Sequence, residues 1–420
     1  MTHEYDLVIV GGGLVGGSLA CALTGQGLRI ALVEAVPHTA AHQPSYDERV
    51  IALALGSRRI FEGIGLWSAI ALEAEPIRRV HVSDRGHCGF THLGPEDSDG
   101  EALGYVAPAR AMGAAIQAAL ARASDVEMLC PARLLAYRRV GEQVELEVQC
   151  EGERRSLRAA LLVAADGGDS AVRQGLDLAV DERSYDQDAV ITTVTPDRPR
   201  PGVAFERFTD TGPLALLPMT QGRYSVVWTC RREQTAELLA LTDAAFIERL
   251  QARFGYRLGQ FRTVAPRRAY PLKLMLTRDP AQPRVILIGN AAHTLHPVAG
   301  QGFNLGLRDV AALAEVIVQG ARAGADLGGP AILADYRAWR GADQSSTARL
   351  TDGLARLFVN PWRPLRVARN LGMSTLDLIP PARRRLAARF MGLHGRLPRL
   401  ARGLPLERPA EKRDARYASK

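Results

Sequence analysis

The N-terminal segment contains two short apolar runs, separated by a glycine-rich turn and a stretch rich in Ala and Leu. The first run covers residues 5–10, the second covers 29–34, and apolar residues recur at helical spacing over 14–24. A strand, a tight turn, a helix and a second strand within about 30 residues predict a βαβ unit. Such a unit implies a parallel sheet, because parallel strands need a long crossover between them.

Further along the chain, the pattern predicts more strands and then helices. Residues 161–165 and 285–288 are continuous apolar runs that end in polar turns, as interior strands of a parallel sheet do. Residues 144–149 alternate between apolar and polar, which is typical of a half-solvated antiparallel strand. Between 181 and 275, short alternating segments interrupted by prolines indicate a second domain with a mixed sheet. From about residue 330 onward, helical spacing returns.

The net charge of +8 is concentrated at the C-terminal end of the 420-residue chain. Residues 361–420 contain 13 Arg and 2 Lys against 4 acidic residues, a net charge of +11, so the first 360 residues carry −3. A nucleic-acid enzyme would spread basic residues over its working face, so we exclude nucleic acid as a partner.

The basic tail also has a helical pattern of apolar residues. Over 383–400, six arginines accompany apolar residues at alternating spacings of four and three, namely Leu386, Phe390, Leu393, Leu397 and Leu400. This pattern predicts a basic amphipathic helix, which would either lie on an anionic lipid surface or pack against the body with its arginines in solvent. Gly392 and Gly395 weaken a continuous helix, and Pro398 is expected to end it.

Two uncharged stretches, 7–28 and 285–307, are long enough to cross a bilayer. The first contains seven glycines and the second contains His, Asn and Gln, which suit a polar ligand better than hydrocarbon. Five cysteines without a CxxC pair argue against a disulfide framework and favour a reducing compartment. We therefore expect a cytoplasmic protein.

The first candidate site is the GxGxxG turn from Gly11 to Gly16. Gly11 would allow the tight turn, Gly13 the approach of a pyrophosphate, and Gly16 the close packing of helix on strand. Glu34 follows the second strand and can accept hydrogen bonds from ribose hydroxyls. The flanking strands and the acid favour dinucleotide binding over a turn of purely structural use.

The second candidate site is the segment 166–173, which directly follows an apolar run. Asp166 would lie at the carboxyl edge of the sheet, where ligands bind in such folds. Taken alone, the segment is better explained as a β-turn followed by a helix with Ser170 as its N-cap.

The third candidate site extends from Gly289 to Gly306 and leads from a buried strand into a helix that begins near Gly302. Its glycines permit close backbone approach to a ligand, and the helix N-terminus can stabilise negative charge. His293 and His296 are spaced i, i+3, but no carboxylate or cysteine completes a ligand set, so we predict no metal.

Together the three segments resemble the signatures of the single-component flavoprotein aromatic hydroxylases, which have the fold of p-hydroxybenzoate hydroxylase. These signatures are GxGxxG with Glu34, DGxxSxxR over 166–173 and GNAAHxxxPxxGQGxN over 289–304. The resemblance extends from about residue 4 to 395 and includes the segments 47–53, 105–110 and 350–358. The third signature is most similar to the ubiquinone-biosynthesis branch, in particular the 2-polyprenyl-6-methoxyphenol hydroxylases.

The resemblance implies an α/β protein with a Rossmann-like FAD-binding domain of the p-hydroxybenzoate hydroxylase fold. This domain would be interleaved with a mixed β-sheet substrate domain and followed by C-terminal helices. We assign the FAD-binding domain to 1–75, 105–180 and 276–345, the substrate domain to 76–104 and 181–275, and the C-terminal helical region with its basic tail to 346–420.

The resemblance also implies which residues form the cofactor site. FAD would be held by Gly11, Gly13, Gly16, Glu34, Arg49, Arg110, Asp166, Asn290, Gly302 and Asn304, and the flavin ring would lie beside Pro297, Gly300, Gly302, Phe303 and Asn304. Arg49 would lie near the flavin or the nicotinamide donor, unless it is a surface residue at a helix start. Asn290 stands where most of the wider family has Asp, and Asn is usual in the 2-polyprenyl-6-methoxyphenol branch.

The substrate pocket is expected on strands of the second domain. Candidate residues are Phe205, Leu216, Pro218, Tyr224 and Trp228, although residues of this type more often form plain core. We assign no catalytic base, because orientation of the ring over the oxidant can be sufficient.

The activity implied by the resemblance is that of an FAD-dependent monooxygenase using NAD(P)H and O2. It would hydroxylate the ring of a polyprenyl phenol through a flavin hydroperoxide, converting 2-polyprenyl-6-methoxyphenol to the benzoquinol in ubiquinone biosynthesis. The alternatives are another ring position, another phenol, an FAD dehydrogenase or reductase that does not activate oxygen, or a non-catalytic flavin-binding scaffold. The implied partners are the membrane-embedded polyprenyl phenol, an anionic lipid surface and a multi-enzyme ubiquinone assembly, with the protein peripheral on the inner face of the cell membrane.

Overall fold

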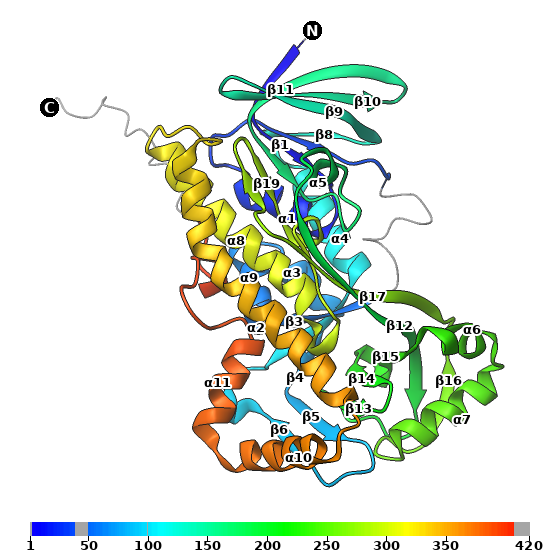
Figure 1. The fold of residues 1–420 in the computed structure, drawn as a ribbon. Coiled ribbons are helices and arrows are strands. Elements are labelled where there is room, and N and C mark those ends of the chain that lie inside the picture. Colours follow the sequence, from blue (N-terminus) through cyan, green and yellow to red (C-terminus); the bar gives the residue numbers. More distant parts are fainter. Residues whose placement is uncertain (1, 38–48, 99, 407–420) are drawn as a thin grey trace, which may run out of the picture.

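The computed structural model describes residues 2–37, 49–98 and 100–406. Positions 47 and 48 of one resembling segment, and residues 407–420 of the basic tail, lie outside the described residues. Figure 1 shows two large sheets, one above the other, with helices running along their side. The predicted α/β class is confirmed.

The first sheet has eight strands and contains the predicted βαβ unit. Its strands are β1 (Thr2–Val10), β2 (Ile30–Val33), β8 (Val126–Leu129), β9 (Ala132–Val140), β10 (Gln143–Cys150), β11 (Glu153–Ala164), β18 (Ala281–Gln282) and β19 (Val285–Leu287). The central order β19-β11-β1-β2-β8 is parallel throughout. Strand β11 begins earlier than predicted, because its first half pairs antiparallel with β10.

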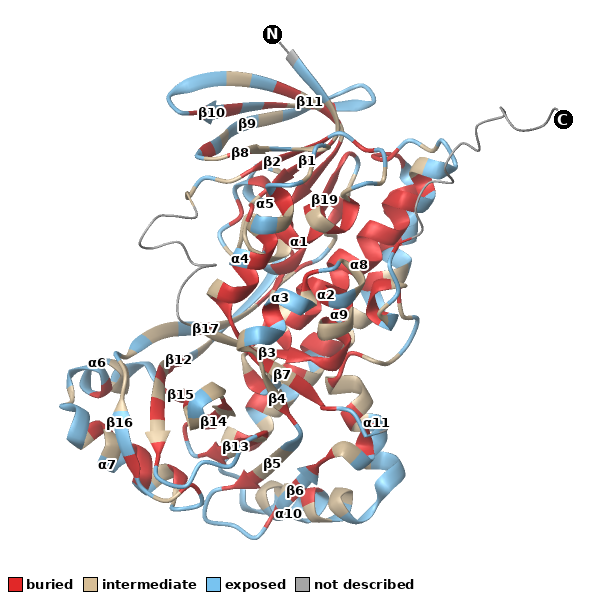
Figure 2. Cartoon of the chain, turned by 180° about the vertical axis from the view of Figure 1, so that it is seen from behind, coloured by how far each residue is buried: buried red, intermediate tan, exposed pale blue. Residues whose placement is uncertain are grey.

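Both faces of this sheet are buried, which explains why its strands are continuous apolar runs. Leu7 and Ile9 of β1 face the helices α1 (Leu14–Leu23), α4 (Ala109–Leu120) and α8 (Gln301–Arg322). Val8 and Val10 face the opposite side, where β9 and β10 cover the sheet. In Figure 2, α1 and α8 are largely red, which marks them as core helices.

The second sheet has nine strands and is mixed. Its strands are β5 (Arg79–Asp84), β6 (Phe90–Leu93), β12 (Val180–Pro196), β13 (Val203–Thr209), β14 (Gly212–Pro218), β15 (Tyr224–Arg231), β16 (Phe261–Val264), β17 (Arg268–Thr277) and β20 (His293–Thr294). Only the pair β13–β5 is parallel among these strands. One face packs against α6 (Arg232–Ala240) and α7 (Asp243–Phe254).

A three-stranded sheet connects the two large sheets. It consists of β3 (Val50–Ala54), β7 (Gly104–Pro108) and β4 (Glu75–Ile77), and β3 leads directly into α2 (Leu55–Gly63) and then α3 (Trp67–Ile70). The short helix α5 (Ala171–Gly175) follows β11. We retain the predicted domain boundaries as our proposed division of the chain.

The C-terminal helices are α9 (Pro330–Val359), α10 (Arg363–Leu378) and α11 (Pro380–Phe390). Figure 1 shows α9 running beside both sheets and α10 lying next to β6. None of the helices in the described part of the chain combines the length and apolarity that a bilayer crossing needs.

The basic amphipathic helix predicted over 383–400 covers only the first part of this segment. Helix α11 ends at Phe390, and the left-handed backbone of Gly392 (φ +69°) and Gly395 (φ +73°) breaks any continuation. The apolar stripe packs against the body, since Leu400 lies in the core beneath α2 and Leu393 packs with α11. Of the two interpretations left open, the structure favours packing on the body for this segment.

Candidate active site

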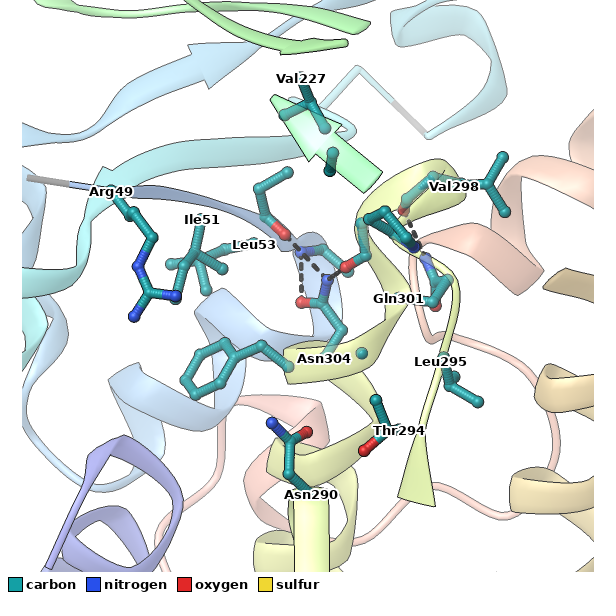
Figure 3. Close-up of a pocket in the computed structure, with 18 of the residues that line it drawn as sticks. Arg49, Ile51, Leu53, Val227, Asn290, Thr294, Leu295, Val298, Gln301 and Asn304 are labelled. Atoms are coloured by element: carbon teal, nitrogen blue, oxygen red, sulfur yellow. Dashed lines mark hydrogen bonds between the residues drawn. The ribbon is translucent and has the colours of Figure 1, made fainter. Parts of the chain in front are cut away.

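One continuous cavity of about 1280 Å³ lies between the two large sheets. One half is formed by the carboxyl ends of β1, β2 and β11 together with β3 and the loop that follows β19. The other half is formed by the face of the second sheet that α6 and α7 leave uncovered. Figure 3 shows side chains of both halves around it, with Arg49, Ile51 and Asn290 in the cofactor half and Val227 on the second sheet.

The GxGxxG turn lies at the nucleotide end of the cavity. Gly11 has a φ of +101°, and a Cβ there would overlap the carbonyl oxygen of Ala165, so the turn requires glycine. A Cβ on Gly16 would overlap the oxygen of Gly11, which explains why this residue packs in the turn and does not line the cavity. Helix α1 has no side-chain cap at Gly13, so its first N–H groups are available to an anion.

Glu34 lies at the end of β2 and lines the same part of the cavity. Its two carboxylate oxygens accept hydrogen bonds from the N–H groups of Gly12 and Val36, each at 2.7 Å. These bonds fix the carboxylate beside the glycine turn. A carboxylate oxygen has a second lone pair, so Glu34 can still accept from a sugar hydroxyl.

The second segment combines a structural role and a ligand-facing role. Ser170 caps α5 by accepting from the N–H of Arg173 at 3.0 Å, as the simpler interpretation predicted. Asp166 lines the cavity, and its Oδ1 is buried with no hydrogen-bond partner among the described residues. A buried carboxylate oxygen without a partner is costly, so this atom is suited to a ligand hydroxyl.

Arg173 joins the second segment to the third. Its guanidinium donates to the carbonyl oxygen of Gly168 at 2.6 Å and to that of Ala291 at 2.9 Å. The arginine of the DGxxSxxR signature therefore holds two loops together, although they are far apart in the sequence.

The third segment is anchored by a buried ionic network. Asp309 of α8 accepts from His293 Nε2 at 2.6 Å and from the N–H of Gly289 at 3.2 Å. Its other oxygen accepts from Arg340 Nε at 2.8 Å and from Gln344 at 3.0 Å. Burial alone would raise the pKa of Asp309, but His293 and Arg340 hold it below its ordinary value. His293 is thus a structural partner of a carboxylate.

Asn304 positions the loop that precedes it. Its amide oxygen accepts from Ala54 N–H at 2.8 Å and from Ser57 Oγ at 2.7 Å, and its amide nitrogen donates to the carbonyl oxygens of Ala52 and Gly300. Figure 3 shows the bonds of Asn304 to the backbone of neighbouring cavity-lining residues as dashed lines. The four bonds use the full capacity of the side chain. Asn304 therefore acts on a cofactor by placing the loop, not through its own side chain.

The remaining predicted loop residues line the cavity together. They are Pro297, Gly300, Gly302 and Phe303, with Asn290 and the buried, unpartnered Oγ1 of Thr294 nearby. A Cβ on Gly302 would meet no atom within 4 Å, so the space above the start of α8 is open to a ligand. Sequence reasoning did not single out Thr294.

The two predicted arginines have different surroundings. Arg49 lines the cavity and lies over the ring of Tyr270, with 5.1 Å between its Cζ and the ring centroid. Arg110 does not line it; its guanidinium forms a bidentate pair with Glu73 at 2.8 and 2.5 Å, which lowers the pKa of Glu73. The structure thus brings Arg49 to the cavity and leaves Arg110 beside it.

The substrate-pocket prediction needs correction. Leu216, Pro218, Tyr224 and Trp228 do not line the cavity; Leu216, Tyr224 and Trp228 belong to the core on the other face of the sheet. Phe205 contributes to the wall, but its ring packs against Phe254 of α7 at a centroid distance of 5.3 Å. Side chains alternate along a strand, so the cavity is lined instead by neighbouring residues such as Pro213, Ala215, Leu217, Val227 and Thr229.

The C-terminal helices form a wall of the cavity that the sequence did not predict. This wall is apolar and consists of Leu354, Phe358, Met373, Leu376, Leu386, Ala387, Phe390 and Met391. Phe358 stacks on Phe208 of β13 at a centroid distance of 3.5 Å, which joins α9 to the second sheet. The signal in the sequence was the helical spacing of Leu386 and Phe390, whose partner could not be identified from spacing alone.

The residues present fit an FAD molecule. Four features lie together at one end of the cavity. They are a glycine turn that excludes any Cβ, an uncapped helix N-terminus, a fixed carboxylate at the end of β2, and the unpartnered Oδ1 of Asp166. This is the donor and acceptor set that a diphosphate and its sugars need. The fold and the site define a flavin-dependent oxidoreductase.

Comparisons with known proteins agree with this class. Residues 4–343 match the family model described as "FAD binding domain". The chain is 40% identical to the ubiquinone hydroxylase UbiL of Rhodospirillum rubrum over 96% of this chain and 93% of that one. It is 32% identical to the 3-demethoxyubiquinol 3-hydroxylase of Escherichia coli, over 94% of this chain and 100% of that one. The p-nitrophenol 4-monooxygenase PnpA of Pseudomonas putida has a similar fold, with a TM-score of 0.77, 21% identity, and coverage of 94% of this chain and 99% of that one.

The chain belongs to the FAD-binding domain family, in the branch of FAD-dependent aromatic hydroxylases that includes the ubiquinone hydroxylases. It is an FAD-dependent monooxygenase.

Proposed function

We propose that the protein hydroxylates the aromatic ring of a polyprenyl phenol in ubiquinone biosynthesis. The observation that supports this most is the apolar half of the cavity, which continues from the loop at Gly300–Asn304 to the C-terminal helices. A prenylated ring needs an apolar wall of this extent next to the cofactor. The names of the relatives at 40% and 32% identity point to the same pathway. We assign the conversion of 2-polyprenyl-6-methoxyphenol to the benzoquinol, with another ring position as the alternative.

The chain supplies placement and exclusion of water. We assign the diphosphate to the N–H groups at the start of α1, after Gly13, ribose hydroxyls to Glu34, and a further FAD hydroxyl to Asp166 Oδ1. Bound FAD supplies the redox chemistry that takes electrons from NAD(P)H and activates O2. Asn304 holds the ring-facing loop in place, and the apolar residues on the second sheet and the C-terminal helices keep water from the reacting atoms.

The test is oxygen incorporation by the purified, FAD-loaded protein. A phenol with one prenyl unit and a 6-methoxy group, given NAD(P)H and ¹⁸O2, should yield a hydroxylated ring with one labelled oxygen. Product formation without O2 would support the dehydrogenase alternative, and no product with any phenol would support the flavin-binding scaffold. In cells that lack the protein, the phenol that accumulates identifies the ring position.

We further propose that α10 lies on an anionic membrane surface, from which the lipid substrate enters. The polar face of α10 is turned to the protein: Arg369 and Asn370 both contact Asp84, and Asp377 accepts from the N–H of His92. The opposite face carries Val367, Leu371 and Leu378, whose exposed fractions are 68%, 66% and 80%. An exposed apolar face of this kind marks a surface that binds another protein or a membrane.

Two features around this face favour a lipid bilayer as its binding partner. The exposed arginines Arg363, Arg384 and Arg385 lie on α10 and α11, which suits anionic headgroups. The inner side of α10 contributes Met373 and Leu376 to the cavity wall, so the same helix separates the cavity from the surface. Figure 2 shows α10 and α11 at the edge of the molecule, largely in the tan and pale blue of intermediate and exposed residues.

Liposome flotation tests this docking surface. The full chain should bind vesicles containing phosphatidylglycerol at low salt, and the double substitution Val367→Asp/Leu371→Asp should abolish binding while FAD absorbance stays unchanged. Leu72→Asp is the matched control, since Leu72 is 84% exposed and lies outside α10 and α11. Equal binding by the α10 variant and the wild type would exclude this surface.

A further inference from the structure

One carboxylic acid lies on the substrate side of the cavity, and the proposed function assigns it no role. Glu206 is in β13, where the pairing places it opposite Val82 of β5 and Ala215 of β14. The row continues through Val227 of β15 to Ile191 of β12. All five residues line the cavity, and the four neighbours of Glu206 in this row are apolar.

The orientation of Glu206 follows from strand alternation. Its neighbours two positions away, Ala204 and Phe208, pack with cavity-lining residues, whereas Arg207 donates to the carbonyl oxygen of Arg253 in α7 on the opposite face. Glu206 therefore points into the cavity.

The carboxyl group of Glu206 has no partner within the described part of the chain. No hydrogen bond or ion pair to another described residue involves it, in contrast to Glu34, whose oxygens are held by two N–H groups. From α9 and α10 the cavity receives only apolar side chains, such as Leu354, Phe358 and Met373. A carboxyl group left unpaired in apolar surroundings is costly unless a ligand completes it.

The other charged groups along the cavity belong to its cofactor half. Glu34, Asp166 and Asp169 lie at the ends of β2 and β11, Arg133 is on β9, and Arg49 precedes β3 and lies over Tyr270 of β17. Burial is the cause that raises the pKa of Glu206 to about 7.

We propose that Glu206 is the catalytic base that receives the proton of the substrate's phenolic hydroxyl, an inference that rests on the proposed function. The phenolic O–H bond breaks, an O–H bond forms on a carboxylate oxygen, and the ring becomes a phenolate. The phenolate pushes electron density to the ring carbon that accepts the oxygen atom. When that carbon loses its hydrogen as a proton, the ring becomes aromatic again, and Glu206 returns its proton to the phenolic oxygen. The proton from the carbon goes to the second oxygen atom of O2, which leaves as water. Glu206 is neither oxidised nor reduced.

The burial of Glu206 makes it a better base for this step than an ordinary glutamate. A phenol has a pKa near 10, and an exposed glutamate near 4.3, a mismatch of about six units. Burial raises the pKa of Glu206 to about 7, so its carboxylate is a stronger proton acceptor than that of an exposed glutamate. The carboxylate of Glu206 would also accept a hydrogen bond from the phenolic hydroxyl of the substrate, a bond that no described residue of the protein supplies.

The first test compares the wild type with Glu206→Gln on two phenols. The first phenol is the methoxy-prenylphenol above, and the second is a fluorinated analogue whose hydroxyl is already ionised at the assay pH. Glu206→Gln should lower kcat about 100-fold with the first phenol and less than about threefold with the second. The wild-type rate should rise with pH through about 7, because the carboxylate form is the base, and this rise should vanish in the variant.

The second test uses thermal unfolding and needs no turnover. A carboxyl group whose pKa is raised in the folded state binds more protons when folded, so the folded protein loses stability as pH rises from about 4.5 to 7. Glu206→Gln should therefore raise Tm at pH 8 and raise it much less at pH 5. Glu182→Gln is the matched control, because Glu182 lies on β12 with 49% of its side chain exposed.

Each outcome decides the proposal. Equal kcat values for the wild type and Glu206→Gln, or an equal loss with both phenols, would overturn the proton transfer while leaving the proposed function intact. Wild-type protein that forms no oxygen-dependent product from either phenol would remove the proposed function and this inference together. Retention of FAD absorbance in Glu206→Gln establishes that the variant is folded.

Discussion

The two halves of the cavity are built in opposite ways. In the cofactor half, polar groups are fixed by short contacts within three continuous segments, such as the two N–H groups that hold Glu34 at 2.7 Å. In the substrate half, apolar side chains come from the second sheet and from α9, α10 and α11, and the single carboxyl group of Glu206 has no partner among the described residues. The first half recognises a defined cofactor through backbone geometry, and the second accepts a ring and a chain through shape and water exclusion.

The largest expected effect tests the rigidity of the cofactor half. In Gly11→Ala, the new residue would have a left-handed backbone that L-residues disfavour, and its Cβ would overlap the carbonyl of Ala165. The substitution should therefore lower the free energy of unfolding by about 4 kcal/mol or more. FAD absorbance should be lost from the purified protein. Gly25→Ala is the control, since Gly25 has a φ of +75° but a Cβ there meets nothing within 4 Å. Similar unfolding curves for the two variants would mean that the overlap is relieved.

The next prediction separates the two faces of β14. Leu216 is fully buried beneath α7, and Leu216→Ala should cost about 3 kcal/mol of stability. Ala215 faces the cavity, so Ala215→Leu should leave stability within about 1 kcal/mol and lower kcat/KM for the prenylphenol at least tenfold. Urea denaturation and steady-state kinetics measure both. The reverse pattern would mean that the pocket lies on the face we assign to the core.

Leu216 and Ala215 also show which part of the site could not be predicted from the sequence. The glycine turn, Glu34 and Asp166 could be predicted because each works within a few residues of a strand end, where local geometry decides the chemistry. Leu216 and Ala215 are adjacent apolar residues in a strand, and only the position of α7 decides which one faces the core. The helical spacing of Leu386 and Phe390 was correct over α11, but the sequence could not identify the cavity as their partner.

A smaller effect is expected at the boundary of the two halves. Gly302 begins α8 with open space above it, so Gly302→Val should change the free energy of unfolding by less than about 1 kcal/mol in the protein without FAD. The same side chain would occupy the space that we assign to the flavin, and FAD affinity should fall at least tenfold. Titration with FAD followed by fluorescence measures this change. A large loss of stability with unchanged affinity would show that the loop is structural and the flavin lies elsewhere.

The smallest effect concerns a residue that supports the cofactor half without lining the cavity. Ser170 caps α5 through the N–H of Arg173, and Arg173 in turn holds the third segment by its bond to Ala291. Ser170→Ala should therefore cost about 1 kcal/mol of stability, the usual value of an N-cap, and weaken FAD binding by no more than about threefold. Ser68→Ala in α3 is the matched control, because Ser68 is exposed and caps no helix, and it should change neither quantity. If Ser170→Ala instead weakened FAD binding tenfold at unchanged stability, the Ser170 hydroxyl would bind FAD directly. FAD binding in the cofactor half would then depend on side chains more than on the backbone geometry of its turns.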